Sequence, residues 1–334
     1  SAEFKNSIAE AYESGILPDS ISSEEAAQNG FTDRVPSLED DLYSYVFSKN
    51  DGTYETLTYD YPVKYYDSEN RLQDKSNQLK EAKTDDGTVY IPESNDIKTV
   101  IPADLSKGIG LEYKDINVRM VYMGNKSKDN PEETPSARAV ISENKRSVAY
   151  FLTDKTSLDY SLTYNGFKEE IVLGAYEGIT DWSFLLYTGG LGLAKSASGD
   201  INLVDDNNNA VINIGRVVVL TADEKNNCLG EMIAETVEKN RLYRITIHID
   251  EEYLESPDTA YPIRIDPSLE IAKSISGAGA IKDITVSSDN NYTESDTYLI
   301  VGTNESHYKY RAIIGFPTLY SSIHGKKIVS ASFE

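Results

Sequence analysis

The sequence has little of what stabilises small secreted proteins or anchors membrane proteins. Its 334 residues include one cysteine, Cys228, so no internal disulfide is possible. No apolar run approaches the roughly 20 residues that a membrane-spanning helix needs, and no secretory signal peptide is visible. We therefore expect a chain that folds around its own hydrophobic core and does not insert into a membrane.

Positive charge is also scarce. The chain has 32 lysines and arginines against 55 aspartates and glutamates, which gives a formal net charge of −23. An acidic surface repels phosphate backbones and anionic bilayers, so nucleic acid is not an expected partner. The same surface favours solubility and leaves room for divalent cations.

Residues that commonly carry catalysis are few and scattered. The three histidines form no His-x-x-x-His or Cys-His cluster, which argues against a zinc site. Cys228 lies in a turn-like Lys-Asn-Asn-Cys-Leu-Gly segment, and Ser183 and Ser198 lack a Gly-x-Ser-x-Gly elbow. With 55 acidic residues, no single pair is nominated for glycoside hydrolysis. We therefore expect a protein that is not an enzyme, and a glycan-active hydrolase remains an alternative.

Alternation of apolar and polar residues dominates what is present. Residues 158–164 (LDYSLTY) have the period of a strand with one buried face. Asn165-Gly166 follows, the pair that favours a two-residue type I′ turn, and residues 167–173 return. This turn predicts a hairpin in which Tyr160 faces Ile171.

Glu169 is the polar residue on the inward face of this predicted hairpin. The two-residue turn places it opposite Leu162, on the buried side of the sheet. Burying an unpaired carboxylate costs several kcal/mol. We therefore predict a cationic or hydrogen-bonding partner, with Arg216 and Arg138 as candidates. The role expected of Glu169 is structural and not catalytic.

Strand patterns continue along most of the chain and predict a mainly β protein. Residues 1–40 carry short helical patterns, and residues 41–267 carry strands and turns typical of a large antiparallel β-sandwich-like domain. Residues 268–280 are rich in small side chains and indicate a linker. A new β pattern begins at 281 and continues to 334, which predicts the start of a second, incomplete β-sandwich.

Three shorter segments allow specific predictions. Residues 71–84 and 125–138 are polar, and both are expected to be loops. The strand at 261–267 contains two prolines, which favours the edge of a sheet over its centre. Trp182 alternates with apolar residues and is expected in the core.

Two sets of residues are candidates for binding. The turn at 205–209 offers oxygen ligands for calcium, but it lacks the spacing of a calcium-binding loop, and a plain hairpin turn is the preferred interpretation. The calcium candidates are Asp205, Asp206 and Asn208. Exposed tyrosines suit stacking on sugar rings, and the candidates are Tyr292, Tyr298, Tyr308 and Tyr310. No other cofactor is expected.

Several motifs follow one another in a fixed order. They are NDGTY at 50–54, YPVKY at 61–65, LDYSLTY at 158–164, KEEIVL at 168–173 and YPIRIDP at 261–267. This ordered set resembles the N-terminal region of large Gram-positive surface proteins, the wall-associated Rhs/YD-repeat proteins and others with a DNRLRE domain. A second set resembles the beginning of the DNRLRE domain itself: DITV at 283–286, NY at 291–292, LIVG at 299–302 and YRAIIGF at 310–316.

The resemblance implies an exported, non-catalytic structural or scaffold module. Its expected location is extracellular, at the cell surface or cell wall of a Gram-positive bacterium, and its expected partner is the remainder of the polypeptide beyond Glu334. Modules related to the DNRLRE domain are β-sandwiches that bind polysaccharide. The alternative function is therefore a carbohydrate-binding module that recognises cell-wall or plant polysaccharide. The resemblance also places Glu169 on the glutamate of a Lys-Glu-x-Ile-Val-Leu pattern.

Overall fold

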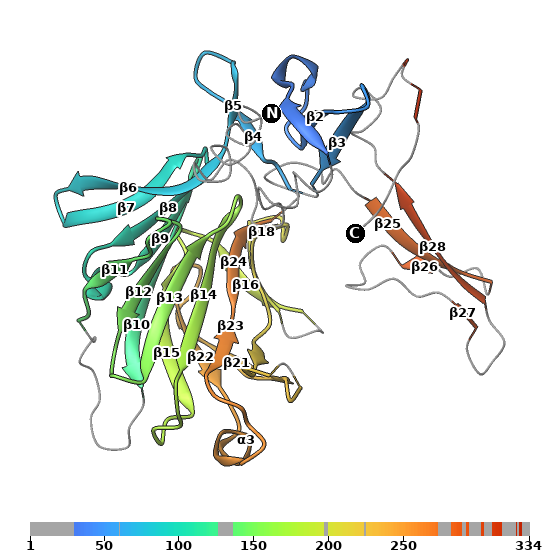
Figure 1. Cartoon of the computed structure of the whole chain (residues 1–334). Helices are drawn as coiled ribbons and strands as arrows, with labels where there is room; N and C mark the ends of the chain where they lie inside the picture. Colours follow the sequence, from blue (N-terminus) through green and yellow to red (C-terminus); the bar gives the residue numbers. More distant parts are fainter. Residues whose placement is uncertain are drawn as a thin grey trace. The chain divides into compact units, whose positions relative to one another are not determined.

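The chain folds into antiparallel β-sheets throughout the part that the structure, a computed structural model, describes (Figure 1). The described residues are 30–59, 61–125, 136–196, 200–223, 225–272, 282–288, 292–293, 302–303, 309–315, 325 and 327–328. The prediction of a mainly β, sandwich-like fold is therefore confirmed. Of the helical segment predicted over 1–40, residues 1–29 lie outside the described residues, and residues 31–34 form a strand and not a helix. Most of the loop predicted at 125–138 also lies outside the described residues.

Two units divide the described strands. One unit contains β1 to β3 and β25 to β28, and the other contains β5 to β24. The boundary lies between Lys64 and Tyr65. The domain expected over 41–267 is therefore divided near its start, because β2 pairs with β1 and β3 and with no strand of the larger unit.

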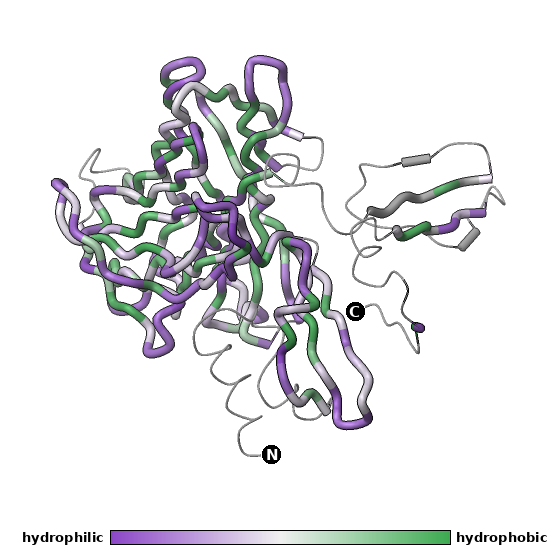
Figure 2. The backbone as a smooth tube through the Cα atoms, turned by 90° about the horizontal axis from the view of Figure 1, so that it is seen from above, coloured by the Kyte–Doolittle hydropathy of each residue, from purple (hydrophilic) through white to green (hydrophobic). Residues whose placement is uncertain are grey.

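The larger unit contains an eight-stranded sheet in the order β21-β22-β15-β10-β9-β8-β7-β6. Its strands are β6 (Ser76–Thr84), β7 (Gly87–Ser94), β8 (Lys98–Pro102), β9 (Ile109–Tyr113), β10 (Ile116–Asn125), β15 (Asp181–Tyr187), β21 (Glu231–Glu238) and β22 (Leu242–His248). Green hydrophobic residues alternate with white and purple ones along the extended segments of the tube, and several loop ends are purple, as expected for strands with one buried face (Figure 2).

The second sheet of the larger unit has eleven strands. Its main order is β11-β12-β13-β14-β24-β18-β17-β16, and β23, β19 and β20 pair alongside. The strands are β11 (Ala139–Ile141), β12 (Ser147–Phe151), β13 (Thr156–Leu162), β14 (Gly166–Leu173), β16 (Gly192–Lys195), β17 (Ile201–Val204), β18 (Ala210–Ile214), β19 (Val218–Leu220), β20 (Cys228–Leu229), β23 (Ile263–Asp266) and β24 (Ser268–Ile271).

One hydrophobic core joins the two sheets of the larger unit. From the eight-stranded sheet, Tyr122 and Phe184 contribute rings whose centroids lie 5.2 Å apart. From the eleven-stranded sheet, Tyr160 lies edge-on to Phe167 with centroids 5.9 Å apart. Trp182 is fully buried, which confirms its predicted place in the core. Each such side chain contributes about 1.5–3 kcal/mol to folding by leaving water.

The smaller unit contains a three-stranded sheet, β1-β2-β3, and a four-stranded sheet, β26-β25-β28-β27. Their strands are β1 (Phe31–Arg34), β2 (Ser44–Lys49), β3 (Tyr54–Thr58), β25 (Lys282–Ser287), β26 (Tyr292–Thr293), β27 (Gly302–Thr303) and β28 (Lys309–Gly315). A separate two-stranded sheet, β4 (Lys64–Tyr66) with β5 (Leu72–Asp74), lies at the boundary in sequence between the units.

A buried ion cluster stabilises the three-stranded sheet. Both oxygens of Glu39 accept hydrogen bonds from Arg34, at 2.9 and 2.5 Å, and the Lys64 Nζ lies 3.3 Å away. The two cations flank the ring of Tyr45, at 4.6 and 4.7 Å from its centroid. Burial raises the pKa of Glu39, but the hydrogen bonds and positive charges lower that pKa by more.

The segment predicted as a linker, 268–280, begins as a strand. β24 pairs with β14 on one side and with β18 on the other. Leu269 and Ile271 are buried in the core. The linker prediction is wrong for 268–271 because two alternating apolar residues, hidden in a segment of small side chains, are enough to hold a central strand. Residues 273–280 lie outside the described part of the chain.

The strand at 261–267 lies inside its sheet and not at the predicted edge. β23 pairs with β14 on one side and with β19 on the other. Pro262 precedes β23, and Pro267 separates it from β24, so neither proline lies within the paired residues of the strand. The two prolines therefore lie at the ends of the strand and do not interrupt the pairing of residues 263–266.

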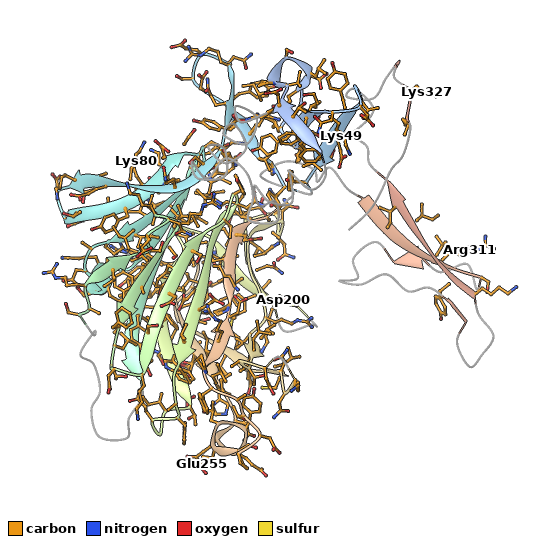
Figure 3. All side chains as sticks on the ribbon, in the orientation of Figure 1. Lys49, Lys80, Asp200, Glu255, Arg311 and Lys327 are labelled. Carbon is orange, nitrogen blue, oxygen red and sulfur yellow. The ribbon has the colours of Figure 1, made fainter. Side chains whose placement is uncertain are left out.

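The polar stretch at 71–84 forms β5 and β6, and the loop prediction is wrong there. β6 pairs with β7 and is the last strand of its sheet. A hairpin at the edge of a sheet is held by backbone pairing and needs little apolar burial, so its polar side chains gave no strand signal. Figure 3 shows Lys80 on this hairpin.

The described part of the chain contains one short α-helix, α3 (Glu251–Glu255). The Asp250 carboxylate accepts a hydrogen bond of 2.8 Å from the backbone N–H of Glu252, which caps the helix. Figure 3 shows Glu255 at its end. No helix among the described residues has the length and apolar character needed to cross a bilayer.

Candidate functional site

The hairpin of β13 and β14 holds Glu169, the most unusual ionisable residue of the larger unit. The observed register pairs Leu162 with Phe167 and Tyr160 with Glu169. Four residues, 163–166, therefore separate the last paired residues of the hairpin, and not the predicted two. The prediction is wrong by two residues, and a shift of two keeps every side chain on its predicted face. Glu169 points inward as expected, but it faces a tyrosine.

Gly166 serves a different purpose from the one the turn prediction assigned. Neither Asn165 nor Gly166 has a positive φ, so the turn is not type I′. A Cβ atom on Gly166 would lie 2.2 Å from the carbonyl oxygen of Leu269 on β24. The glycine therefore allows β24 to approach β14 closely.

Groups from outside the hairpin fix its turn. Lys75 donates from Nζ to the carbonyl oxygen of Tyr164 at 3.2 Å, and Thr99 donates from Oγ1 to that of Gly166 at 3.0 Å. Lys75 is almost fully buried and forms an ion pair of 2.8 Å with Asp96. The bonded residues are about seventy to ninety positions apart in the sequence, so no local sequence pattern predicts these bonds.

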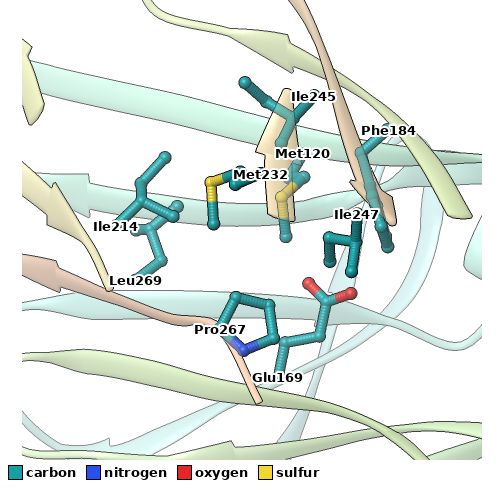
Figure 4. Close-up of a pocket in the computed structure, with 9 residues that line it drawn as sticks. All are labelled: Met120, Glu169, Phe184, Ile214, Met232, Ile245, Ile247, Pro267 and Leu269. Atoms are coloured by element: carbon teal, nitrogen blue, oxygen red, sulfur yellow. The ribbon is translucent and has the colours of Figure 1, made fainter. Parts of the chain in front are cut away.

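Glu169 lies in the interior between the two sheets and has no solvent exposure. It is the ionisable residue among the nine that line a small cavity of about 10 Å³, and Met120 and Met232 contribute thioethers from the opposite sheet (Figure 4). A cavity needs about 10–15 Å³ on this scale to hold one water molecule. The carboxyl group is therefore surrounded almost entirely by apolar atoms.

The partner predicted for Glu169 is not a cation. Neither oxygen of its carboxyl group accepts a hydrogen bond of normal geometry, so neither Arg216 nor Arg138 is that partner. The Tyr160 hydroxyl lowers the pKa of Glu169, but burial raises it by much more, to about 8. At neutral pH the side chain is therefore mostly the neutral acid, which costs far less to bury than a carboxylate.

The backbone around Glu169 is also unusual. Pro267 lies directly across from it, because β23 and β24 follow one register along β14. The N–H of Glu169 donates to the Pro267 carbonyl oxygen at 3.3 Å. Proline has no N–H to return, so the ladder has one missing bond where the buried acid lies.

The outer face of the same strands carries a network of charges. Lys168 lies 3.0 Å from an oxygen of Glu170 and 3.0 Å from an oxygen of Asp266. The other oxygen of Glu170 accepts a 3.0 Å hydrogen bond from Arg264. Asp159, directly opposite Glu170, accepts a hydrogen bond from a serine beside it and not from a cation. The sequence signal for this network was the alternation of polar residues in 158–164 and 168–173.

The tyrosines predicted to bind sugar are only partly within the described residues. Tyr310 lies on β28 with a half-buried side chain. Tyr292 lies on β26, but its side chain is outside the described part, and Tyr298 and Tyr308 lie outside it entirely.

The calcium candidates form a turn that uses its own carboxylate. Asp205 accepts hydrogen bonds from the backbone N–H groups of Asn207 and Asn209, at 2.9 and 2.8 Å. Its other oxygen accepts one from the Asn209 side chain, and these bonds lower the pKa of Asp205. Asp206 and Asn208 lie in the same exposed turn. Among the described residues, no three or more acidic, histidine or cysteine side chains gather as a metal site.

Part of the chain is similar to a known bacterial protein. No family model matches the chain. A curated relative, the tRNA(Glu)-specific nuclease WapA of Bacillus subtilis subsp. natto (strain BEST195), is 28% identical over 121 residues. The similarity covers 34% of this chain and 5% of the length of that protein. The chain is thus similar to a small part of a much longer bacterial protein.

Proposed function

We propose that the chain is a non-catalytic structural module of a large bacterial cell-surface protein, of the Rhs/YD-repeat or DNRLRE type. In this proposal the module is exported to the cell surface or cell wall of a Gram-positive bacterium. Its partner is the rest of its own polypeptide. The partial similarity to WapA supports a place within a longer bacterial protein, and the nuclease activity in that protein's name is not carried over.

The observation that carries the proposal is the enclosure of Glu169. It is the carboxyl group with the most strongly raised pKa among the described residues, and such groups often mark catalytic sites. Here both packed sheets surround it, and the cavity beside it has room for about one water molecule. The packed side chains around this carboxyl group leave no room for a substrate beside it, which supports a non-catalytic role.

A substrate screen tests the non-catalytic part. The chain is incubated with panels of glycans and peptides, and we expect no turnover above the buffer rate. Asp159→Asn and Glu170→Gln are the diagnostic variants for any turnover that is seen. These two carboxyl groups lie opposite each other on an outer sheet face. Reproducible turnover that either substitution abolishes contradicts the proposal.

Protease treatment of intact cells of the source bacterium tests the location. We expect the parent protein to be cleaved from the outside, with peptides of this chain released while a cytoplasmic marker stays intact. Protection of the chain until the cells are lysed contradicts surface display.

A further inference from the structure

One edge of the eight-stranded sheet is open. β21 (Glu231–Glu238) ends the strand order of that sheet and pairs with β22 and with no other strand of the described residues. Its sequence contains no lysine and no proline, the residues with which proteins commonly protect such an edge. An unprotected row of backbone N–H and C=O groups is a template for pairing with another strand.

The opposite edge of the same sheet is protected in the usual way. The exposed residues of β6 are all polar, and they include Lys80 and Lys83. Lys83 also forms an ion pair of 2.8 Å with Glu81. On β21, in contrast, Ile233 is 39% exposed and Val237 is 54% exposed. The two ends of the sheet therefore differ, and only β21 presents large apolar side chains beside its edge.

The unoccupied part of this edge has clear limits. Lys195, on β16, donates from Nζ to the carbonyl oxygen of Met232 at 3.1 Å, so this carbonyl accepts a bond from outside the ladder with β22. At the other end, the register shifts between Thr236 and Glu238, which marks a bulge. Residues 233–236 lie between these features and have no backbone partner on their outer side among the described residues.

A pocket of about 140 Å³ lies beside the start of the strand. Its apolar lining includes Val217, Leu229 and Met232, and Leu229 is 63% exposed. One water molecule needs about 10–15 Å³ on this scale, so the pocket has room for one large side chain. When a strand is added to a sheet, backbone bonds supply affinity and pockets for alternate side chains supply specificity. Both parts are present at this edge.

The alternation of side chains defines what an added strand must carry. Its residues point in turn to the two faces of the sheet. On the inner face one of them lies next to Met232 and reaches the pocket, which suits a large apolar residue. On the outer face its side chains lie beside Ile233 and Glu235. Glu235 forms no ion pair among the described residues, although Arg244 is opposite it on β22, so a basic residue of the added strand gains a partner there.

Charge argues against a second copy of this chain as the partner. β21 carries Glu231, Glu235 and Glu238. Two copies paired along this edge bring twice that number of carboxylates into one seam, and like charges on paired strands are destabilising. A strand with basic residues is complementary in charge.

The shortness of the open stretch indicates where the partner comes from. A ladder limited to residues 233–236 holds a free partner only weakly, whereas a strand in the same polypeptide has an effective concentration of about millimolar through a short flexible linker. We propose that β21 pairs with a strand from the rest of the longer polypeptide, which carries a large apolar residue for the pocket and a basic residue beside Glu235. This rests on the proposed function, in which the rest of the polypeptide is the partner.

Hydrogen exchange of the parent protein and of this chain alone tests the pairing. We expect the amides of residues 231–238 to exchange about tenfold more slowly, or slower still, in the parent protein. The control is the opposite edge, residues 76–84, which is expected to exchange at the same rate in both. Equal rates at 231–238, or the same slowing at both edges, overturn the proposal.

Photocrosslinking identifies the source of the strand. A benzophenone amino acid replaces Ile233 in the parent protein, and mass spectrometry identifies the crosslinked peptides. We expect a crosslink to a segment of the same polypeptide outside this chain. Glu235→Lys is expected to lower its yield about fivefold, because it places like charges together. Glu112→Lys is the matched control, because Glu112 is exposed on β9, which has a strand on either side.

Three results of the crosslinking overturn the proposal. They are a crosslink to a different protein, a crosslink between two copies in a mixture of isotope-labelled and unlabelled protein, and a yield that Glu235→Lys leaves unchanged. The scaffold role survives each of them, because the substrate screen and the protease test measure it separately. Turnover in that screen contradicts the scaffold role and leaves the strand pairing intact.

Discussion

Glu169 and Pro267 lie opposite each other on neighbouring strands and share a single backbone hydrogen bond of 3.3 Å. The proline returns no donor, and the glutamate side chain is fully buried without a hydrogen bond of its own. Two local weaknesses of the sheet therefore coincide at one position. Both line the small cavity between the two sheets, where apolar side chains from both sheets surround them.

The first prediction concerns pH. The pKa of Glu169 is 4.5 when unperturbed and about 8 in the folded protein. Between these values the folded state binds more protons than the unfolded state, so the free energy of unfolding falls as pH rises. The slope from this group is about 1.4 kcal/mol per pH unit, or roughly 5 kcal/mol in total, and it ends above pH 8.

Glu169→Gln removes this titration while keeping the shape of the side chain. We expect the free energy of unfolding of the variant, relative to that of the wild-type chain, to rise from pH 5 to pH 8 and then to level off. Urea unfolding at each pH measures both proteins, and their difference cancels the other titrating groups. A difference that stays constant with pH contradicts the raised pKa.

The second prediction concerns Gly166. Its missing Cβ would collide with the Leu269 carbonyl oxygen, so Gly166→Ala forces β24 away from β14. We expect a loss of more than about 2 kcal/mol in the free energy of unfolding, in the range of overpacking and backbone strain. Gly110→Ala is the control, because the nearest atom to its Cβ lies 3.4 Å away. Equal losses for both variants contradict the packing role.

The third prediction concerns Lys75. Burial lowers its pKa, while the Asp96 carboxylate opposes that change. Lys75→Met keeps the apolar stem but removes the bond to Tyr164 and leaves Asp96 unpaired, with an expected cost of about 1–3 kcal/mol. Lys98→Met is the control, because Lys98 is exposed on β8 and has no such partner among the described residues. Thermal unfolding of both variants is followed by the fluorescence of the buried Trp182. An unchanged stability of Lys75→Met contradicts the role of Lys75 in holding the hairpin turn.

The fourth prediction concerns the ion cluster of the smaller unit. Arg34→Met leaves Glu39 buried with one cation, and the expected cost is about 3 kcal/mol, typical of breaking a buried pair. Lys49→Met breaks the partly exposed pair with Glu55 and is expected to cost under about 1 kcal/mol. Hydrogen exchange of residues 31–59 measures the local opening in each variant. Faster exchange in the Lys49 variant than in the Arg34 variant contradicts the importance of the cluster.

The faces of the central hairpin were predictable because side-chain direction follows a period of two. Leu158, Tyr160, Leu162 and Glu169 all point inward as the pattern predicted. The register was not predictable from Asn165-Gly166, because the turn is bonded to Lys75 and Thr99 and its glycine is needed by β24. Contacts from distant sequence overruled the local preference of the turn.

The charged residues on the outer face of the hairpin were also predictable only in part. The alternation around Asp159 and Glu170 placed them on one outer face, but only the pairing with β23 brought Arg264 beside them. The sequence also gave no sign that 71–84 would form strands, because an edge hairpin needs partners and not apolar side chains.

By itself, the sequence determined that this protein is mainly β and which side of each alternating strand enters the core, since both depend on neighbouring residues. Only the tertiary structure decided what each inward residue meets. Glu169 meets Tyr160, Pro267 and two methionines in place of the predicted arginine. The physical reason is that strand order and register depend on contacts across up to a hundred residues, which no local pattern encodes.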